Sequence, residues 1–239
     1  MPRPLIEVAI ATADDARAAH TGGADRLELS TALELGGLTP SLGALGAVRE
    51  AAPLPLVTML RPRPGGFVYS AGEWAAVRRD ADVLLAGGAD AVVVGVLHPD
   101  RTINVPRLRS LVEQIGPRRC VFHRAFDLVP DPIAALDVLM ELGVARVLTS
   151  GQRATAVEGM ELIRRLVHHA AGRIEILPGS GVGPDNAVRL LSYTGAGQVH
   201  GSFSVARSDP AGVVCEAGYR VTDRSRVGAT RTAVDSAGA

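Results

Sequence analysis

The sequence predicts a single-domain α/β protein with the fold of a parallel (β/α)8 TIM barrel. The 239 residues come close to the roughly 250 that this fold typically contains. Short apolar runs alternate with helical stretches, which is typical of parallel strands joined by crossover helices. We expect the barrel core to span residues 1–205. Residues 206–239 are expected to form a C-terminal segment with a last helix and a disordered tail.

Each predicted strand is a short run that is rich in valine, isoleucine or leucine and follows a turn. The eight runs cover 5–10, 26–30, 56–61, 91–97, 120–124, 146–149, 173–177 and 198–200. The helical stretches between and after them cover 14–21, 42–51, 73–86, 105–114, 132–142, 157–169, 185–193 and 223–234.

A glycine-containing turn stands before every second predicted strand. The four turns are 22–25, 87–90, 142–145 and 194–197. Glycine commonly ends a helix because it adopts the left-handed conformation without strain. The repeat therefore favours an even-numbered barrel, although Gly-Ala-Asp is also an ordinary helix-to-strand turn.

Composition and charge exclude several classes of protein. The chain is 47% hydrophobic and 21% charged, which indicates a folded domain rather than a disordered chain. Its 25 basic and 25 acidic residues balance, and no basic run carries interleaved aromatics, so nucleic acid is not an expected partner. No signal-peptide core or apolar span of membrane length is visible, so we expect a cytoplasmic protein that does not bind membranes.

The reactive side chains that are missing are equally informative. All 25 basic residues are arginine, so neither a Schiff-base lysine nor a pyridoxal phosphate anchor is possible. Cys120 and Cys215 stand alone, without a second cysteine or a histidine at ligand spacing. A structural zinc site is therefore not expected.

Charged residues interrupt the first two predicted strands, where parallel strands are normally apolar. Glu7 lies between two apolar residues, and Arg26 and Glu28 share one face because side chains alternate along a strand. That face must look into the barrel, where we expect the three to pair with one another or with a ligand. A purely structural ion-pair network is an open alternative for Glu7 and Arg26, whereas Glu28 lies nearer the functional end.

Two further strand ends carry charged residues at the carboxyl end of the barrel, where active sites of this fold lie. Arg61 is well placed to bind a carboxylate or phosphate, whereas a structural role is as plausible for Arg63. His123, Arg124 and Asp127 lie within five residues of one another at the end of the fifth predicted strand. His123 and Asp127 share strand parity, so Asp127 is predicted to orient the His123 imidazole or to accept its proton if the strand continues that far.

The last three strand ends supply candidate substrate-binding residues, namely Thr149, Ser150, Gly179, Gly181 and His200. Barrels often bind phosphate with the glycine-rich loops after the seventh and eighth strands. A glycine-rich turn is weak evidence taken alone.

Five segments together closely resemble the CutC copper homeostasis protein family. They are 23–29 (GADRLEL), 36–41 (GGLTPS), 61–63 (RPR), 122–127 (FHRAFD) and 146–151 (RVLTSG). The resemblance runs in order through the whole barrel. It implies a cytosolic (β/α)8 barrel that takes part in copper homeostasis and copper tolerance, as a homodimer or other small homo-oligomer.

The chain departs from the family at the copper ligands. The ligands proposed for the family are cysteines on the first two strands, where this chain has Ala9 and Ser30. Copper(I) prefers thiolate and thioether ligands, and Cys120, Cys215 and Met59 are scattered along the chain. The sequence therefore argues against strong copper(I) binding, and we assign no metal ligands. The remaining carboxylate, hydroxyl and imidazole groups suit a harder divalent ion.

A second departure is Gly66, where many relatives carry an acidic residue, although Phe67 and Tyr69 match the family pattern.

Two main hypotheses follow, and they leave open whether the protein is an enzyme. The first is a copper-handling protein, as the resemblance implies. The second is a lysine-independent enzyme acting on a small phosphorylated or carboxylated metabolite, with Arg61 and Arg124 binding the anion. His123 would then be the general acid or base, with Glu28 as its carboxylate counterpart and Asp127 beside it. A structural or regulatory barrel is a third possibility.

Overall fold

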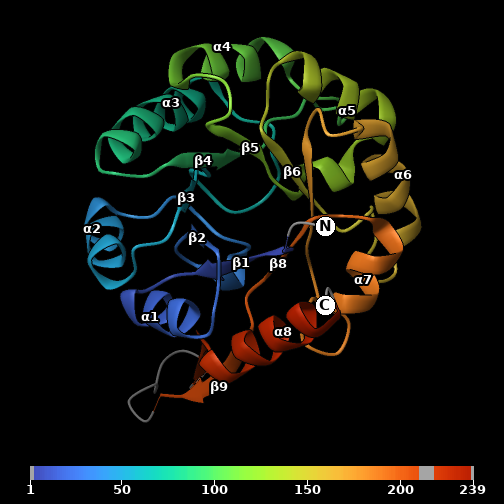
Figure 1. The fold of residues 1–239 in the computed structure, drawn as a ribbon. Coiled ribbons are helices and arrows are strands. Elements are labelled where there is room, and N and C mark those ends of the chain that lie inside the picture. The colour runs from blue at the N-terminus through green and yellow to red at the C-terminus, as the bar shows by residue number, and fades with distance from the viewer. Residues whose placement is uncertain (1–2, 210–217, 238–239) are drawn as a thin grey trace.

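A computed structural model of the chain shows eight parallel strands in a nearly closed barrel surrounded by helices (Figure 1). The structure describes residues 3–209 and 218–237. The barrel strands pair in the order β7-β6-β5-β4-β3-β2-β1-β8. An isolated parallel bridge between Gly179 and His200 joins the two ends of this sheet. The predicted (β/α)8 barrel is confirmed.

The element bounds follow the predicted order. The barrel strands are β1 Leu5–Ile10, β2 Arg26–Leu29, β3 Leu56–Met59, β4 Ala91–Val94, β5 Cys120–Phe122, β6 Arg146–Thr149, β7 Glu175–Pro178 and β8 Gln198–Gly201. The α-helices are α1 Ala13–Thr21, α2 Leu42–Ala51, α3 Ala71–Ala86, α4 Val105–Ile115, α5 Pro132–Glu141, α6 Met160–Ala170, α7 Ala187–Thr194 and α8 Arg224–Ala237. Two 3-10 turns, η1 Leu33–Leu35 and η2 Arg124–Leu128, lie in the loops after β2 and β5.

Several strands end earlier than predicted. The third strand, expected to reach residue 61, ends at Met59. The Leu60 N–H still donates to the Val93 carbonyl at 2.7 Å, but the Arg61 N–H donates to Thr39 Oγ1 at 2.9 Å. The chain therefore leaves the sheet just before its first charged residue, because a loop side chain replaces the neighbouring strand as hydrogen-bond acceptor.

The predicted glycine turns are confirmed as helix ends. Gly23 follows α1 with φ of 92°, and Gly88 follows α3 with φ of 104°. Gly143 and Gly195 follow α5 and α7 with φ of 75° and 72°. A side chain in this conformation is strained, which explains why glycine recurs at these four positions.

The apolar core forms two layers. The larger layer fills the space between the strands and the surrounding helices, with Leu27, Val92 and Phe122 among its fully buried members. A small cluster of Val57, Met59, Val93 and Val121 lies apart from it, with Ala91 packed against it. Because these strand residues alternate with members of the larger layer, the small cluster lies inside the barrel.

The C-terminal segment adds a hairpin that the sequence did not predict. Strands β9 Ser204–Ser208 and β10 Gly218–Thr222 pair antiparallel, and α8 packs beside α7 and α1 (Figure 1). Asp15, at the start of α1, accepts a 2.7 Å hydrogen bond from the Thr222 N–H and so ties β10 to the barrel. The predicted last helix is present over Arg224–Ala237, and the end of the predicted disordered tail lies outside the described residues.

Candidate functional site

A cavity of about 190 Å³ opens at the carboxyl end of the strands, and we call it the mouth cavity. Polar groups and a few apolar side chains line it together. The lining residues are Ala9, Glu28, Ser30, Leu33, Gly36, Met59, Arg61, Phe67, His123, Arg124, Leu148 and His200. Five predicted site residues therefore meet at one place: Glu28, Arg61, His123, Arg124 and His200.

A charge network lies beside this cavity and extends deeper into the barrel, and of its charged members only Glu175 is exposed. Register pairs Glu7 with Arg26 on neighbouring strands, and the Arg26 Nε donates to the Glu7 carboxylate. Arg26 also donates to Gln198 Oε1 at 2.6 Å, and Arg146 pairs with Glu175 at 2.7 Å. The predicted pairing of Glu7 and Arg26 is confirmed, so Arg26 lies in the network rather than on the cavity wall.

The charge of Glu7 is strongly favoured although the residue is only 1% exposed. Burial raises its pKa, but Arg26, a hydrogen bond from His200 and the more distant Arg146 outweigh burial. The pKa therefore lies well below its usual range. The His200 Nδ1 lies 2.8 Å from Glu7 Oε1.

Glu28 behaves in the opposite way. It is 4% exposed, and its Oε2 is buried with no hydrogen-bond partner within the described part of the chain. Burial raises the pKa of Glu28 to about 7; His200 opposes this rise and Glu7 adds to it. The carboxyl group is therefore poised to change its charge near neutral pH.

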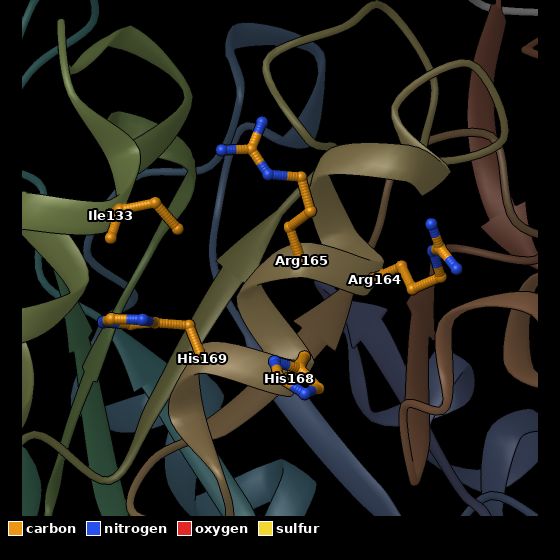
Figure 2. Close-up of a pocket in the computed structure, with 5 residues that line it drawn as sticks. All are labelled: Ile133, Arg164, Arg165, His168 and His169. Atoms are coloured by element: carbon orange, nitrogen blue, oxygen red, sulfur yellow. The ribbon is translucent and has the colours of Figure 1, made fainter.

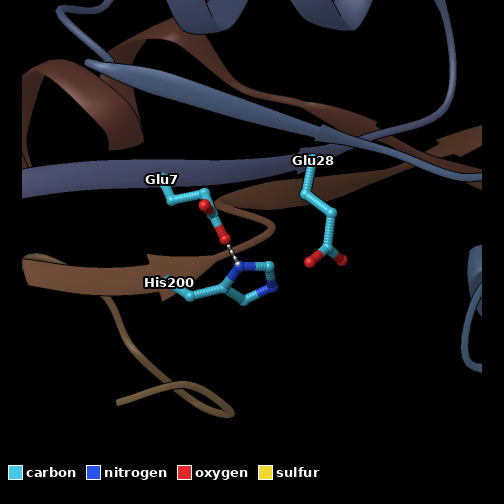
Figure 3. Close-up of side chains that lie close together, drawn as sticks. All are labelled: Glu7, Glu28 and His200. Carbon is cyan, nitrogen blue, oxygen red and sulfur yellow. Dashed lines mark hydrogen bonds and ion pairs between the residues drawn. The ribbon is translucent and has the colours of Figure 1, made fainter. Parts of the chain in front are cut away.

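Glu7, Glu28 and His200 could together hold a metal ion (Figure 3). One ligand atom from each lies within 4.8 Å of the others. Among residues 3–209 and 218–237 this is the one group of three histidine, cysteine or acidic side chains with that spacing. Burial lowers the pKa of His200, but the charges of Glu28 and Glu7 leave it above its usual value.

His123 is held as a neutral hydrogen-bond donor. Its Nδ1 accepts the Ala125 N–H at 3.0 Å, which places the ring proton on Nε2. That Nε2 is buried without a partner in the described chain. Burial and the Arg61 charge lower its pKa to about 3, and the ring packs 4.7 Å from that of Phe67. The imidazole can thus donate to a ligand at neutral pH.

The predicted pairing of Asp127 with His123 is wrong. The Asp127 carboxylate accepts hydrogen bonds from Thr149 Oγ1 at 2.5 Å and from the Gln152 N–H at 3.2 Å. The physical reason is that β5 ends at Phe122 and the chain turns into η2, so strand parity does not extend to residue 127. Asp127 holds the β6 loop, and its predicted catalytic role stays a prediction without contact to the imidazole.

Thr149 and Ser150 belong to this loop-holding cluster. The Thr149 hydroxyl donates to Asp127, and the Ser150 N–H and Oγ contact the same carboxylate at 3.0 to 3.1 Å. Arg124 pairs with Asp127 at 2.8 Å and donates to Ser150 Oγ at 2.8 Å. Neither residue lines the cavity: Ser150 contacts the lining residue Arg124, and Thr149 is linked to it through Asp127.

Arg61 is held by backbone carbonyl groups rather than by a carboxylate. Its two Nη atoms donate to the carbonyls of Leu35, Gly37 and Gly65 at 2.7 to 3.2 Å. Its Nε is buried without a partner among the described residues. The guanidinium lies 5.2 Å from the centre of the Phe67 ring. Phe67 lines the cavity but was not predicted to be a site residue. The one sequence feature that pointed to Phe67 was its match to the family pattern.

The two predicted glycines lie outside the cavity lining. Gly179 bridges to His200, and a Cβ on Gly179 would lie 2.6 Å from the Leu148 side chain. Gly181 has φ of 71° and packs against Thr155. Their predicted role in phosphate binding is a prediction that no contact in the structure tests.

A second hollow lies on the outer surface, between α5 and α6 (Figure 2). It measures about 530 Å³ and is lined by Ile133, Arg164, Arg165, His168 and His169. Arg164 pairs with Glu161 at 2.9 Å, and His169 contacts Asp137 at 2.7 Å. The sequence assigned no role to these histidines, and two of the four polar side chains already have partners.

These features define a class of protein: a parallel (β/α)8 barrel with carboxylate, imidazole and guanidinium groups in a cavity at the carboxyl end. The sequence matches the CutC family over residues 4–205. The chain belongs to this family.

Named relatives agree with the match. A family protein CutC from Treponema denticola is 46% identical over 205 residues, which cover 86% of this chain and 83% of the relative. The copper homeostasis protein cutC homolog of Homo sapiens is 43% identical over 203 residues, covering 85% and 74%.

Solved structures also resemble this chain in fold. The putative copper homeostasis protein CutC from Streptococcus agalactiae superposes with a TM-score of 0.79 at 31% identity, covering 83% of this chain and 98% of that one. Thiamine phosphate pyrophosphorylase from Pyrococcus furiosus, at 16% identity and a TM-score of 0.61, shares the fold alone.

Among the described residues, no helix has the length and apolar character needed to span a membrane.

Proposed function

We propose that this protein takes part in copper homeostasis and that the mouth cavity is its working site. The observation that carries the proposal is the 43% identity to the human copper homeostasis protein cutC homolog across 85% of this chain. Glu28 and His123 lie within residues 4–205, which match the CutC family, and both line the cavity. This role in the cell does not by itself identify the ligand. The side chains that line the cavity determine which ligand it can bind.

The residues present do not fit tight binding of copper(I). Ala9 and Ser30, where the resemblance expects cysteines, both line the cavity. Met59 supplies the one thioether in the lining, and the Cys120 thiol is buried in the layer between strands and helices. Burial raises the pKa of Cys120 to about 12, so it stays a thiol. Copper(I) favours thiolates, and residues 3–209 and 218–237 offer no thiolate in the cavity; Cys215 lies outside these residues.

A growth assay tests the proposed role. A host strain lacking the gene is grown over a copper series and complemented with the wild-type chain or with Glu28→Gln. We expect deletion to change copper tolerance, wild type to restore it and Glu28→Gln to restore it less. A surface variant, Glu113→Gln on α4, serves as the control. Identical growth of deleted and complemented strains at every copper concentration would refute the role.

One observation favours a second candidate, the binding or conversion of a small organic anion. Arg61 Nε, His123 Nε2 and Ser30 Oγ are buried atoms without partners in the described chain, and all three residues line the cavity. Two of these atoms are fixed donors that a carboxylate or phosphate would accept from. A thermal-shift screen of small carboxylates and phosphates tests it. Stabilisation that His123→Ala abolishes is expected, whereas no hit among such anions would count against it.

We also propose a cytoplasmic location and a homodimer or other small homo-oligomer, as expected for the family. Cell fractionation and light scattering of the purified protein test these two proposals.

A further inference from the structure

We propose that Glu28 and His200, with Glu7 behind the imidazole, form a site for one divalent cation such as Cu²⁺ or Zn²⁺. The inference deepens the proposed function, on which it rests for the cavity concerned. The ligands that it assigns are carboxylate and imidazole groups. They differ in kind from the cysteines that the resemblance expects where this chain has Ala9 and Ser30.

The geometry is that of a metal-binding histidine supported from behind. His200 Nδ1 lies 2.8 Å from Glu7 Oε1, and the ring edge that carries Cε1 and Nε2 faces the Glu28 carboxylate (Figure 3). When Nδ1–H donates to Glu7, the neutral ring presents a lone pair on Nε2. Histidine ligands in proteins commonly donate their second N–H to a carboxylate in this way. One ligand atom from each of the three residues lies within 4.8 Å of the others.

The charges leave room for a cation at Glu28. Glu7 contacts Arg26 and, at 3.8 Å, Arg146, whose Nε pairs with Glu175 at 2.7 Å. Two carboxylates therefore neutralise two arginines deeper in the barrel. Glu28 has no arginine partner among the salt bridges of the described residues, and its Oε2 is buried without a hydrogen bond there. A buried carboxylate oxygen without a partner is unfavourable, and a bound cation would satisfy it.

The donor set selects the kind of cation. Carboxylate oxygen and imidazole nitrogen suit Cu²⁺ and Zn²⁺, whereas Cu⁺ prefers sulfur. Met59 is the sulfur-bearing residue in the lining of the mouth cavity. Ser30, whose hydroxyl is a neutral oxygen group, lines the same cavity. The cavity of about 190 Å³ leaves space for water molecules to complete the coordination.

The competing interpretation is a purely structural network with no ligand. It accounts well for Glu7, whose carboxylate has Arg26 and His200 as hydrogen-bond partners. It does not account for the unpartnered Oε2 of Glu28 or for the orientation of the His200 ring toward it. The two interpretations differ in one measurable property, which is metal affinity at these side chains.

Calorimetric titration of the metal-stripped full chain with ZnCl₂ and with CuCl₂ tests the site. We expect one ion per chain, with affinity lowered at least about tenfold in Glu28→Gln and in His200→Ala, and about 10- to 100-fold in Glu7→Gln. Glu113→Gln and His20→Ala, on the exposed faces of α4 and α1, are matched controls that should bind as wild type does.

Electron paramagnetic resonance of the Cu²⁺ complex gives a readout that a structural role would not move. Nitrogen hyperfine coupling from an imidazole is expected in the wild type and in His20→Ala, and its loss is expected in His200→Ala. Circular dichroism checks that each variant folds. If His200→Ala does not fold, Glu28→Gln decides, because the amide keeps the shape of the side chain.

The site is refuted if neither ion binds or if Glu28→Gln and His200→Ala bind Zn²⁺ and Cu²⁺ as wild type does. It is also refuted if only Cu⁺ binds and Met59→Leu abolishes that binding. The titration decides the cation site alone, and the growth assay decides the copper role alone. Variants that lose the ion yet restore copper tolerance would therefore support the site and separate it from that role.

Discussion

The Nδ1 of His200 lies 2.8 Å from the Glu7 carboxylate, although 193 residues separate the two in sequence. The contact joins β8 to β1, the neighbouring strands at which the end of the barrel sequence meets its beginning. The same imidazole lies beside Glu28 in the mouth cavity. The geometry of the candidate site therefore depends on the completed barrel.

Replacing Glu7 by glutamine should lower the free energy of unfolding by about 3–5 kcal/mol, because Arg26 loses its buried counter-charge. Urea denaturation followed by circular dichroism measures the change. Glu113→Gln on the surface of α4 should stay within about 0.5 kcal/mol of wild type. A loss below about 1 kcal/mol in Glu7→Gln would show that Arg26 finds another partner.

Stability should fall as the pH rises toward neutrality, and Glu28 should be a main cause. Its pKa is raised from 4.5 to about 7 in the folded protein. Its protonated form thus adds stability that is complete below pH 4.5 and is lost as the pH rises through about 7. The loss is on the order of 3 kcal/mol. Melting temperatures of wild type and Glu28→Gln across this range check it, since the variant should lack this part of the slope.

Glu7 should act in the opposite pH direction. Its folded-state pKa lies below the usual 4.5, so its charge stabilises the fold above that pH and the contribution disappears as the pH falls further. Acid unfolding of wild type and Glu7→Gln measures this contribution. Parallel acid transitions in the two proteins would contradict the assignment.

Placing cysteine at residues 9 and 30, where the resemblance to the family expects it, should create copper(I) affinity. Ala9 and Ser30 both line the mouth cavity, at 7% and 1% exposure. We expect the double variant Ala9→Cys, Ser30→Cys to compete for Cu⁺ with a chromogenic chelator at least about tenfold better than wild type, because thiolates are the preferred ligands. Cys120→Ser should leave Cu⁺ competition unchanged. Equal competition by wild type and the double variant would place the two side chains too far apart for joint binding.

Gly95 makes the space that the His123 ring occupies. A Cβ at residue 95 would lie 2.1 Å from Cε1 of His123. Gly95→Ala should therefore displace the imidazole and destabilise the protein by about 1–3 kcal/mol. Gly46→Ala on α2 is the matched control: its Cβ would have no neighbour within 4 Å, and it should stabilise the helix by about 0.5–1 kcal/mol. Thermal unfolding distinguishes the two, and equal effects would contradict the packing argument.

The sequence predicted the barrel and the inward face of its first two strands for a clear physical reason. Charged residues at Glu7, Arg26 and Glu28 share strand parity, and a charge in a buried parallel strand must find a partner. His123 and His200, which were predicted as site residues at strand ends, line the same cavity. These inferences succeeded where the residue lies within a strand or immediately at its end.

Prediction failed where the backbone stops being a strand. Asp127 was paired with His123 on the assumption that β5 continues, but η2 turns its carboxylate toward the β6 loop. The hairpin of β9 and β10 was missed, since its exposed strands lack an apolar run. Phe67 reached the cavity from a loop, and loop geometry has no periodicity from which to infer it.

His200 also takes part in the bridge to Gly179 that joins β7 to β8. That bridge uses only the backbone of residue 200, so the sheet places no demand on the identity of its side chain. The bridge itself therefore does not require an imidazole, whereas the contact of Nδ1 with the Glu7 carboxylate does depend on the side chain. In the proposed cation site, one substitution at residue 200 would therefore change the ligating group and leave this backbone bridge in place.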